Sequence, residues 1–280
     1  MKYNIALFLI FVITACQHQT TNYRFDKKSL TDHYNTKNFN LLILWDQRIQ
    51  KEDEQNLLPL QLKEFLKSTL NNNQTRILIA GLDGNPPHFF LSSNAAHLPT
   101  DYSSLFYSVE KLELSKFARR YNPNISILKS TKELIQNYTY KNFFLPQNDF
   151  IVLILSTQDD ENYAINMQGQ KYQDRMETDV QALIKLNQGQ WTIGKGYQQS
   201  LSFKQLRIFV LAPTSQCLQS FNPADKLFYA ATKINAHFTQ EIEDWKRDQE
   251  NFNICNLNFK NYFETIGKAI EHRYEQKINR

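Results

Sequence analysis

Four short apolar runs along the chain have the length and composition of strands that are buried on both faces. They lie at residues 39–46 (FNLLILWD), 75–83 (TRILIAGLD), 148–157 (NDFIVLILST) and 205–213 (QLRIFVLAP). A continuous apolar run, in contrast to an alternating one, is typical of a strand in a parallel sheet that helices cover on both sides. The second run is stopped by Gly84 and by Pro86-Pro87, and residues 88–104 after it are expected to form a long loop.

Between and after these runs, apolar residues recur at helical spacing. Such segments lie at residues 54–70, 105–120, 172–187, 224–238 and 259–273. Strands that alternate with helices predict an α/β fold with a mostly parallel central sheet flanked by helices. We expect this sheet and its helices to form a single domain over residues 39–280.

The first sixteen residues have the layout of a secretory signal, with a positive charge at Lys2 and an apolar run over residues 5–13. This run is too short to span a bilayer. Two small residues then precede Cys16, and the stretch ITAC resembles the lipobox of bacterial lipoproteins. The resemblance implies cleavage after residue 15 and acylation of Cys16, for example with palmitate. An ordinary cleaved signal beside a chance cysteine is the alternative.

Acyl chains on Cys16 would anchor the chain firmly, because each buried methylene contributes about 0.8 kcal/mol. Gln17 stands where an inner-membrane retention signal usually carries aspartate, which favours the periplasmic face of the outer membrane. Residues 16–38 are polar and aperiodic and are expected to be a flexible tether. The covalent lipid is the only cofactor-like group that we expect.

The composition is that of a globular protein, with 41% hydrophobic residues and a formal net charge of +4. The charges are interspersed, so no basic stripe suggests a nucleic-acid partner. The sequence contains no GxSxG elbow and no glycine-rich loop followed by Lys-Ser or Lys-Thr. We therefore predict neither an enzyme nor a small-molecule substrate.

With Cys16 acylated, two cysteines remain, Cys217 and Cys255. In an oxidising compartment we expect them to form a disulfide, with free thiols as the alternative. Closing this loop would stabilise the fold by about 4 kcal/mol. Their spacing excludes a CxxC redox pair and the usual cysteine zinc site.

Three longer segments resemble the von Willebrand factor A-like domain of bacterial lipoproteins. They are LLILWDQRIQKEDEQ at residues 41–55, NFFLPQNDFIVLILSTQDDEN at residues 142–162, and NICNLNFKNYFETIGKAIE at residues 253–271. The family usually has an apolar strand followed by Asp-x-Ser-x-Ser and a Glu-Gln pair, then an acidic loop after a later strand. It also has a cysteine before the last helix, paired with a cysteine after a strand. Cys255 and Cys217 match these two cysteines.

The resemblance implies a metal-ion-dependent adhesion site that starts at Asp46, but the other positions depart from the pattern. The two serine positions are Arg48 and Gln50, and the position of the later aspartate is Thr157. The guanidinium of Arg48 stays charged in proteins. It would repel a cation about 4 Å away by about 4 kcal/mol at an effective dielectric near 20. We therefore expect no bound metal, and a pairing of Arg48 with Asp46 or Asp159 would replace the cation.

Other residues with chemical potential are expected to be structural. Asp159-Asp160-Glu161 is interpreted as a solvated acidic loop in preference to a calcium cluster. The histidines at positions 88, 97 and 237 lack a partner at metal-ligand spacing and are expected to pack or to face solvent. Phe89-Phe90 and Phe143-Phe144 are expected in the core or as loop plugs, with exposed docking surfaces as the alternative. Trp45 is expected in the core.

Together these features predict a non-catalytic lipoprotein that binds another envelope protein, for example as a component of a secretion apparatus. One alternative is a metal-dependent adhesin whose Asp46 and Asp159 still hold a cation. A second is an envelope hydrolase, and a third is a structural lipoprotein that binds further copies of itself in a ring.

Overall fold

The computed structural model describes residues 39–46, 49, 58–72, 75–85, 87–91, 108–109, 112, 126–141, 143–145, 148–160, 170–187, 206–215, 217, 223–236, 253–255, 259, 262–263 and 266. The predicted signal, the tether, Cys16, Arg48, Gln50, Glu161, His97 and His237 lie outside these residues, as does most of the helix predicted at 105–120. No helix among the described residues is long and apolar enough to cross a membrane.

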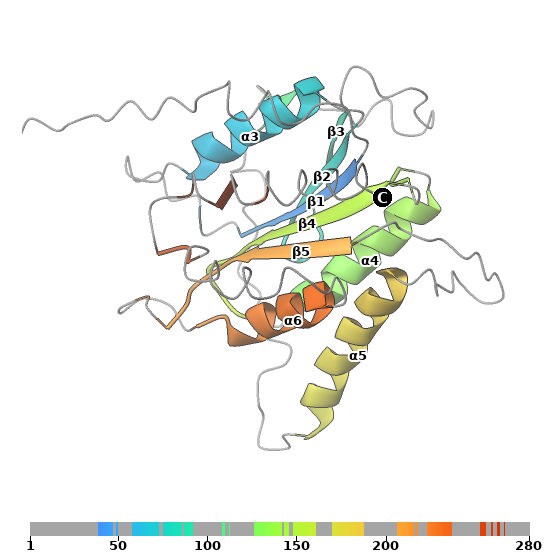
Figure 1. Ribbon diagram of the computed structural model, residues 1–280, viewed down its shortest axis with the longest axis vertical. Helices are drawn as coiled ribbons and strands as arrows, with labels where there is room; N and C mark the ends of the chain where they lie inside the picture. The colour runs from blue at the N-terminus through green and yellow to red at the C-terminus, as the bar shows by residue number, and fades with distance from the viewer. Residues whose placement is uncertain are drawn as a thin grey trace, which may run out of the picture.

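A central sheet of five strands organises the described part of the chain (Figure 1). The strands are β1 (Phe39–Trp45), β2 (Arg76–Gly81), β3 (His88–Leu91), β4 (Asp149–Leu155) and β5 (Leu206–Leu211). Their order is β3-β2-β1-β4-β5. The pairs β1–β2, β1–β4 and β4–β5 are parallel, and β3 runs antiparallel to β2. The predicted mostly parallel α/β sheet is therefore confirmed.

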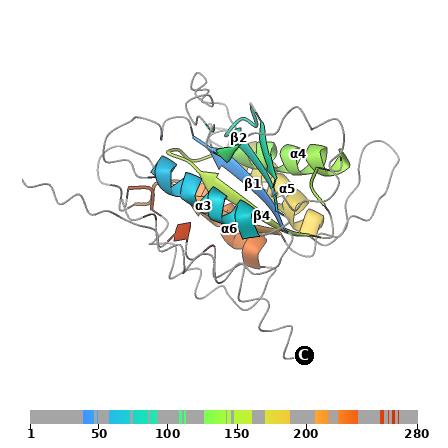
Figure 2. The same ribbon diagram turned by 90° about the horizontal axis from the view of Figure 1, so that it is seen from above.

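Helices cover both faces of this sheet. They are α3 (Leu58–Asn72), α4 (Ile127–Tyr140), α5 (Gln170–Asn187) and α6 (Asp225–Ala236). Helix α3 lies on one face, and α4, α5 and α6 lie on the other (Figures 1 and 2). Helices α3, α4 and α5 each lie in the chain between two strands, and α6 follows the last strand. This order is expected for parallel strands joined by crossover connections.

Two apolar cores explain why the strands carry apolar residues on both faces. In β1, Leu42 and Leu44 belong to the core beneath α4, α5 and α6. Leu41, Ile43 and Trp45 belong to the opposite core beneath α3. All five side chains are fully buried, which explains why this part of β1 is apolar on both faces.

The α3 side of the sheet is completed by residues near the end of the chain. Phe259, Tyr262, Phe263 and Ile266 are helical and buried in the α3-side core. The rings of Phe65 in α3 and Phe263 stack with centroids 5.0 Å apart. The helix predicted at residues 259–273 is confirmed at these four positions.

Two elements differ from the prediction. Residues 88–91 were expected in a loop but form β3, and Phe89 and Phe90 are almost fully buried there. Helix α4 was not predicted. It begins after Ser126, whose Oγ accepts a hydrogen bond from the backbone N–H of Lys129 at 3.3 Å.

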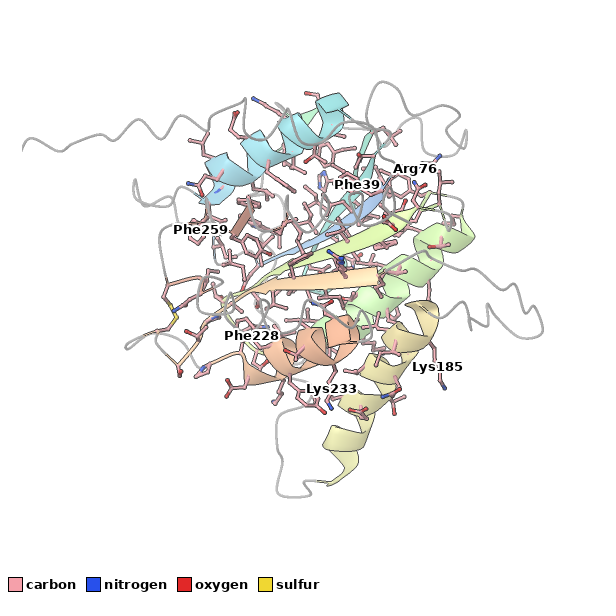
Figure 3. All side chains as sticks on the ribbon, in the orientation of Figure 1. Phe39, Arg76, Lys185, Phe228, Lys233 and Phe259 are labelled. Atoms are coloured by element: carbon pink, nitrogen blue, oxygen red, sulfur yellow. A yellow bond between two sulfur atoms is a disulfide. The ribbon has the colours of Figure 1, made fainter. Side chains whose placement is uncertain are left out.

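The amino ends of β1 and β2 hold the segment that leads into β4. The side-chain amide of Asn40 donates to the carbonyl of Leu145 at 2.8 Å and accepts from its N–H at 3.1 Å. Arg76, labelled in Figure 3, donates from Nη1 to the carbonyl of Phe143 at 2.6 Å. Burial lowers the pKa of Arg76. Phe143 and Phe144 are fully buried, so they belong to the core and are not a docking surface.

Candidate functional site

The carboxyl ends of β1 and β4 meet where the strand order of the sheet reverses. From β1 the chain continues outward through β2 and β3 in one direction, and β4 and β5 extend in the other. In open α/β sheets ligands bind at such a switch point, beyond the carboxyl ends of the strands. Asp46 follows β1 and Thr157 lies two residues after β4, so these two predicted site residues stand at the expected place.

Asp46 and Thr157 are bonded directly to each other. Asp46 Oδ2 accepts from the backbone N–H of Thr157 at 2.8 Å and from its hydroxyl at 2.5 Å. The backbone N–H of Asp46 donates to the carbonyl of Leu155 at 2.8 Å. Both side chains are buried, with exposed fractions of 2% and 6%. The carboxylate therefore ties the exit of β1 to the exit of β4.

Asp159 faces the first turn of α6. Its Oδ2 accepts from the N–H of Lys226 at 3.1 Å, and its Oδ1 accepts from that of Leu227 at 3.0 Å. The N–H of Asp160 also donates to Oδ1, at 2.9 Å. Burial raises the pKa of Asp159, and these backbone N–H groups oppose the rise. The carboxylate supplies acceptors for helix N–H groups that have no partner within the helix.

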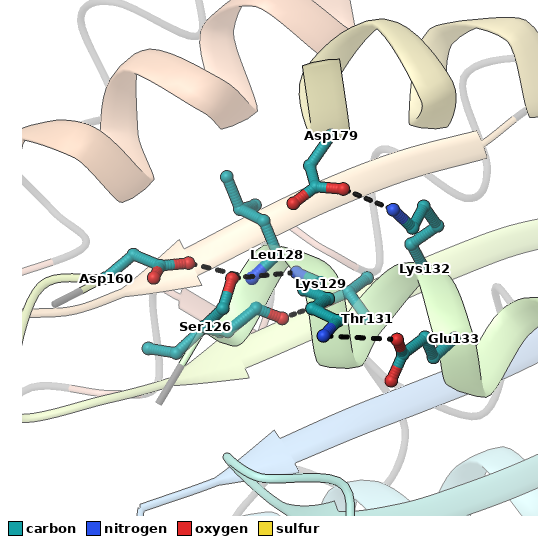
Figure 4. A network of polar contacts seen from close by, with 9 residues as sticks. Ser126, Leu128, Lys129, Thr131, Lys132, Glu133, Asp160 and Asp179 are labelled. Carbon is teal, nitrogen blue, oxygen red and sulfur yellow. Dashed lines mark hydrogen bonds and ion pairs between the residues drawn. The ribbon is translucent and has the colours of Figure 1, made fainter. Parts of the chain in front are cut away.

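Asp160 faces α4 instead. It is fully buried, and its Oδ2 accepts from the N–H of Leu128 at 2.9 Å (Figure 4). Burial raises the pKa of Asp160 to about 7, and the neighbouring charge of Asp159 acts in the same direction. The N–H of Leu128 favours the ionised form but only partly offsets these effects.

The prediction of a solvated acidic loop is therefore wrong for Asp159 and Asp160. The two helix N-termini offer N–H groups and positive dipole ends, which make burial of these carboxylates tolerable. Sequence reasoning missed this role because the partners lie 67 and 32 residues away along the chain. The local pattern of apolar and polar residues cannot predict a hydrogen bond between a carboxylate and a helix so far away along the chain.

Asp83, which lies two residues after the end of β2, serves a local turn. It is exposed, and its Oδ1 accepts from the N–H of Asn85 at 3.0 Å. Gly84 between them has a φ of 84°, a conformation that favours glycine. Within the described residues, no group of three or more His, Cys, Asp or Glu side chains could hold a metal ion.

An ion pair joins α4 to α5, and the sequence analysis did not identify it. The ammonium of Lys132 contacts the carboxylate of Asp179 (Figure 4). Both side chains are largely buried, with side-chain exposed fractions of 21% and 12%. Because they lie 47 residues apart, no local pattern could have indicated the pair.

Cys217 and Cys255 form a disulfide with their Cα atoms 5.6 Å apart, as predicted. It lies beyond the carboxyl end of β5, where the segment at 253–255 runs beside the strand exit. The N–H of Ile254 donates to the carbonyl of Ala212 at 3.2 Å, and Ala212 and Asn253 form a parallel bridge. The disulfide therefore attaches the end of the chain to the edge of the sheet that carries Thr157.

No protein-family model matches the chain, and no curated protein matches it. The carboxylates at the switch point have structural hydrogen-bond partners, and the predicted second and third ligand positions, Arg48 and Gln50, lie outside the described residues. The described residues of the site thus form a set of internal bonds among the ends of β1 and β4 and the helices α4 and α6.

Proposed function

We propose that this chain is a lipid-anchored, non-catalytic lipoprotein that binds another protein of the cell envelope through a degenerate von Willebrand A-like domain. The observation that carries the proposal is the bonding of Asp46 to Thr157 at the switch point. A residue placed to hold a cation instead closes the site by bonding to the neighbouring strand exit.

The family resemblance is supported by where its motifs fall in the fold. Asp46 follows the central strand β1, and the acidic loop follows its parallel neighbour β4. Cys217 follows β5, and Cys255 precedes the helical residues that begin at Phe259. A mostly parallel sheet with helices on both faces is the architecture that the resemblance implies.

The hydrogen bonds that the carboxylate oxygens at the switch point already accept support the absence of a metal site. A hard divalent cation needs six or more oxygen ligands from carboxylates, carbonyls or water. Oδ2 of Asp46 already accepts two hydrogen bonds from Thr157. The carboxylates of Asp159 and Asp160 accept from the N-termini of α6 and α4. A cation ligated by these same oxygens would compete with these hydrogen bonds.

The lipid on Cys16 would place this domain at the periplasmic face of the outer membrane, on a tether of about twenty residues. A rigid α/β platform on a flexible anchor suits a subunit that docks onto a larger envelope assembly. A secretion apparatus is one such assembly. Replacing Cys16 by serine should move the protein from the membrane fraction to the soluble fraction, and retention of Cys16→Ser in the membrane fraction would contradict the anchor.

Calorimetry tests the absence of a metal site. We expect the full chain, purified in detergent, to give no binding isotherm with Mg²⁺, Mn²⁺ or Ca²⁺. The double variant Arg48→Ser, Gln50→Ser should not bind these ions either, because Thr157 still donates hydrogen bonds to the carboxylate of Asp46. Adding Thr157→Asp to the double variant should create binding. An isotherm for the parent chain that disappears in Asp46→Ala would overturn the proposal.

Crosslinking in cells followed by mass spectrometry tests the protein partner. We expect crosslinks to a specific envelope protein that are lost or strongly reduced in Cys16→Ser, because the anchor concentrates the domain at the membrane. Crosslinks only between copies of this chain would indicate a self-assembling structural lipoprotein. No specific crosslink at all would contradict a scaffold function.

A metal-dependent binding protein is the second candidate, because Asp46 and Thr157 present a carboxylate and a hydroxyl at the switch point. Both are oxygen ligands that Mg²⁺ and Ca²⁺ accept. The same calorimetry separates the two candidates, since only this one predicts an isotherm for the parent chain.

A further inference from the structure

Strand β5 is the last strand of the sheet in the described part of the chain. An edge strand presents a row of backbone N–H and C=O groups that can pair with a strand of another molecule. The opposite edge strand, β3, has only four residues, which limits such pairing. Strand β5 has six residues and therefore offers the longer edge.

The outward backbone groups of β5 can be identified from its pairing. The carbonyl of Leu211 accepts from the N–H of Ser156, just beyond β4, so it points toward β4. Successive residues of a strand point their backbone groups to opposite edges, and Ile208 lies three residues from Leu211. The N–H and C=O of Ile208 therefore point away from β4, toward the side of β5 on which no other strand lies among the described residues.

One side chain of α6 satisfies both of these groups. Oδ1 of Asn235 accepts from the N–H of Ile208 at 3.0 Å, and its Nδ2 donates to the carbonyl of Ile208 at 2.8 Å. A side-chain amide thus takes the place that a residue of a neighbouring strand would occupy. At the far end of β5 the edge is covered differently, by the N–H of Ile254 on the carbonyl of Ala212.

The sequence of β5 makes an open edge hazardous. The segment LRIFVL is six residues long, is rich in β-branched and aromatic residues, and contains neither proline nor glycine. Its only charged residue is Arg207, whose side chain is buried. Segments of this length and composition pair readily with identical segments of other chains.

We propose that the amide of Asn235 caps the edge of β5 and prevents this strand from pairing with β5 of a second copy of this chain. Helix α6 holds Asn235 in place. Leu227, Ala231 and Ile234 of α6 are fully buried in the core, and Asp159 binds the first turn of α6. The amide of Asn235 therefore reaches Ile208 from a fixed element, with little freedom to leave.

The variant Asn235→Ala tests the proposal, and the chain offers a matched control. Asn40 makes the same pair of amide-to-backbone bonds, with Leu145, but it lies on the central strand β1. Asn40→Ala therefore loses equivalent hydrogen bonds without opening an edge. Both variants and the parent would be prepared as full chains in density-matched detergent. Sedimentation velocity and thioflavin T fluorescence would be followed over a range of protein concentrations.

We expect Asn235→Ala to form species of twice the parent's protein mass and larger, with a rise in thioflavin T fluorescence as concentration increases. The parent and Asn40→Ala should keep the same mass distribution as each other. A further variant, Asn235→Asp, keeps an acceptor for the N–H of Ile208 and adds a charge at the edge, so it should behave like the parent.

Two results would overturn the proposal. If Asn235→Ala sediments like the parent at every concentration, Asn235 is not what prevents β5 from pairing between copies. If Asn40→Ala or Asn235→Asp associates as strongly as Asn235→Ala, general loss of stability causes the association and the edge of β5 does not.

Discussion

Three carboxylates that follow β1 and β4 differ in what they accept, and this decides their roles. Asp46 accepts from the backbone N–H and the hydroxyl of Thr157, on the neighbouring strand exit. Asp159 and Asp160 accept from backbone N–H groups of two different helices. Asp160 is fully buried, and the backbone N–H groups of Leu128 and Ile127 only partly offset the effect of burial, which therefore dominates its pKa.

The raised pKa of Asp160 predicts a specific pH dependence of stability. Its pKa is about 7 in the folded chain and about 3.9 when unfolded, so between these values the folded state binds the proton more tightly. The stabilisation from this proton is complete below about pH 4 and is lost as pH rises through 7. Replacing Asp160 by asparagine removes the effect. The free energy of unfolding of Asp160→Asn, relative to the parent, should rise by about 2 to 3 kcal/mol between pH 5 and pH 8.

Urea unfolding at several pH values measures this difference. Asp83→Asn is the matched control, because the carboxylate of Asp83 is exposed and lies in a local turn. The difference between this control and the parent should stay nearly constant over the same range. A constant difference for Asp160→Asn as well would show that the carboxyl of Asp160 is ionised throughout.

The hydroxyl of Thr157 should contribute measurably to stability. Thr157→Val keeps the backbone bond to Asp46 but removes the hydroxyl donor from a buried carboxylate. A hydrogen bond to a charged group contributes about 1.5 to 3 kcal/mol, so the free energy of unfolding should fall by that amount. Thr157→Ser retains the hydroxyl and should lose less. A loss of stability in Thr157→Ser but none in Thr157→Val, measured by urea unfolding, would mean that the methyl group matters and the hydroxyl does not.

At the level of elements, the apolar runs were sufficient to predict the parallel strands because both faces of each are buried. The same reasoning failed for α4, whose inner face carries polar residues. Thr131 and Thr139 are buried there, and the hydroxyl of Thr131 donates to the carbonyl of Ile127 at 2.8 Å. These threonines interrupt the apolar stripe that identifies a helix. Strand β3 was missed because four residues directly after a proline pair resemble a loop.

The candidate site was predictable in position but not in its bonds. The order of strands places Asp46 and Thr157 at the same edge, and the sequence alone identified both. The direct bond between them depends on the register of β1 and β4, in which Trp45 lies opposite Leu155. The attachment of Asp159 to α6 likewise depends on a helix 67 residues away. Neither of these two contacts can be derived from the local spacing of residues in the sequence.

Asp159 should act as a cap for α6 as a whole element. Asp159→Ala leaves the N–H groups of Lys226 and Leu227 without their carboxylate acceptor. Loss of a helix cap costs about 0.5 to 2 kcal/mol. Hydrogen exchange should therefore accelerate in the first turn of α6, while exchange in α3 on the opposite face stays unchanged and provides the internal control. Equal acceleration in both helices would indicate global destabilisation and would contradict a local cap.

At the scale of the whole molecule, two cores share one sheet but are closed differently. The core beneath α4, α5 and α6 is covered by three described helices. The core beneath α3 depends in addition on Phe259, Tyr262, Phe263 and Ile266, which come from the end of the chain. Only a few residues before them, the disulfide attaches this part of the chain to the exit of β5. The α3 side of the sheet is therefore the part of the fold that should depend most on the disulfide.

Reducing the disulfide should destabilise the fold and expose the α3 side first. Residues 217 and 255 are 38 positions apart, and releasing a loop of this length costs about 4 kcal/mol in the chain-entropy model. The double variant Cys217→Ser, Cys255→Ser should show the same loss of unfolding free energy in urea as the parent in reductant, and reductant should not affect the variant further. Hydrogen exchange under native conditions would be followed in two peptides, one that contains Phe263 and one that contains its stacking partner Phe65 in α3. Both should lose more protection than α5, because α5 packs on the other core. Uniform loss of protection across both cores would mean that the disulfide stabilises the sheet as one unit and that the end of the chain is not a separable cover.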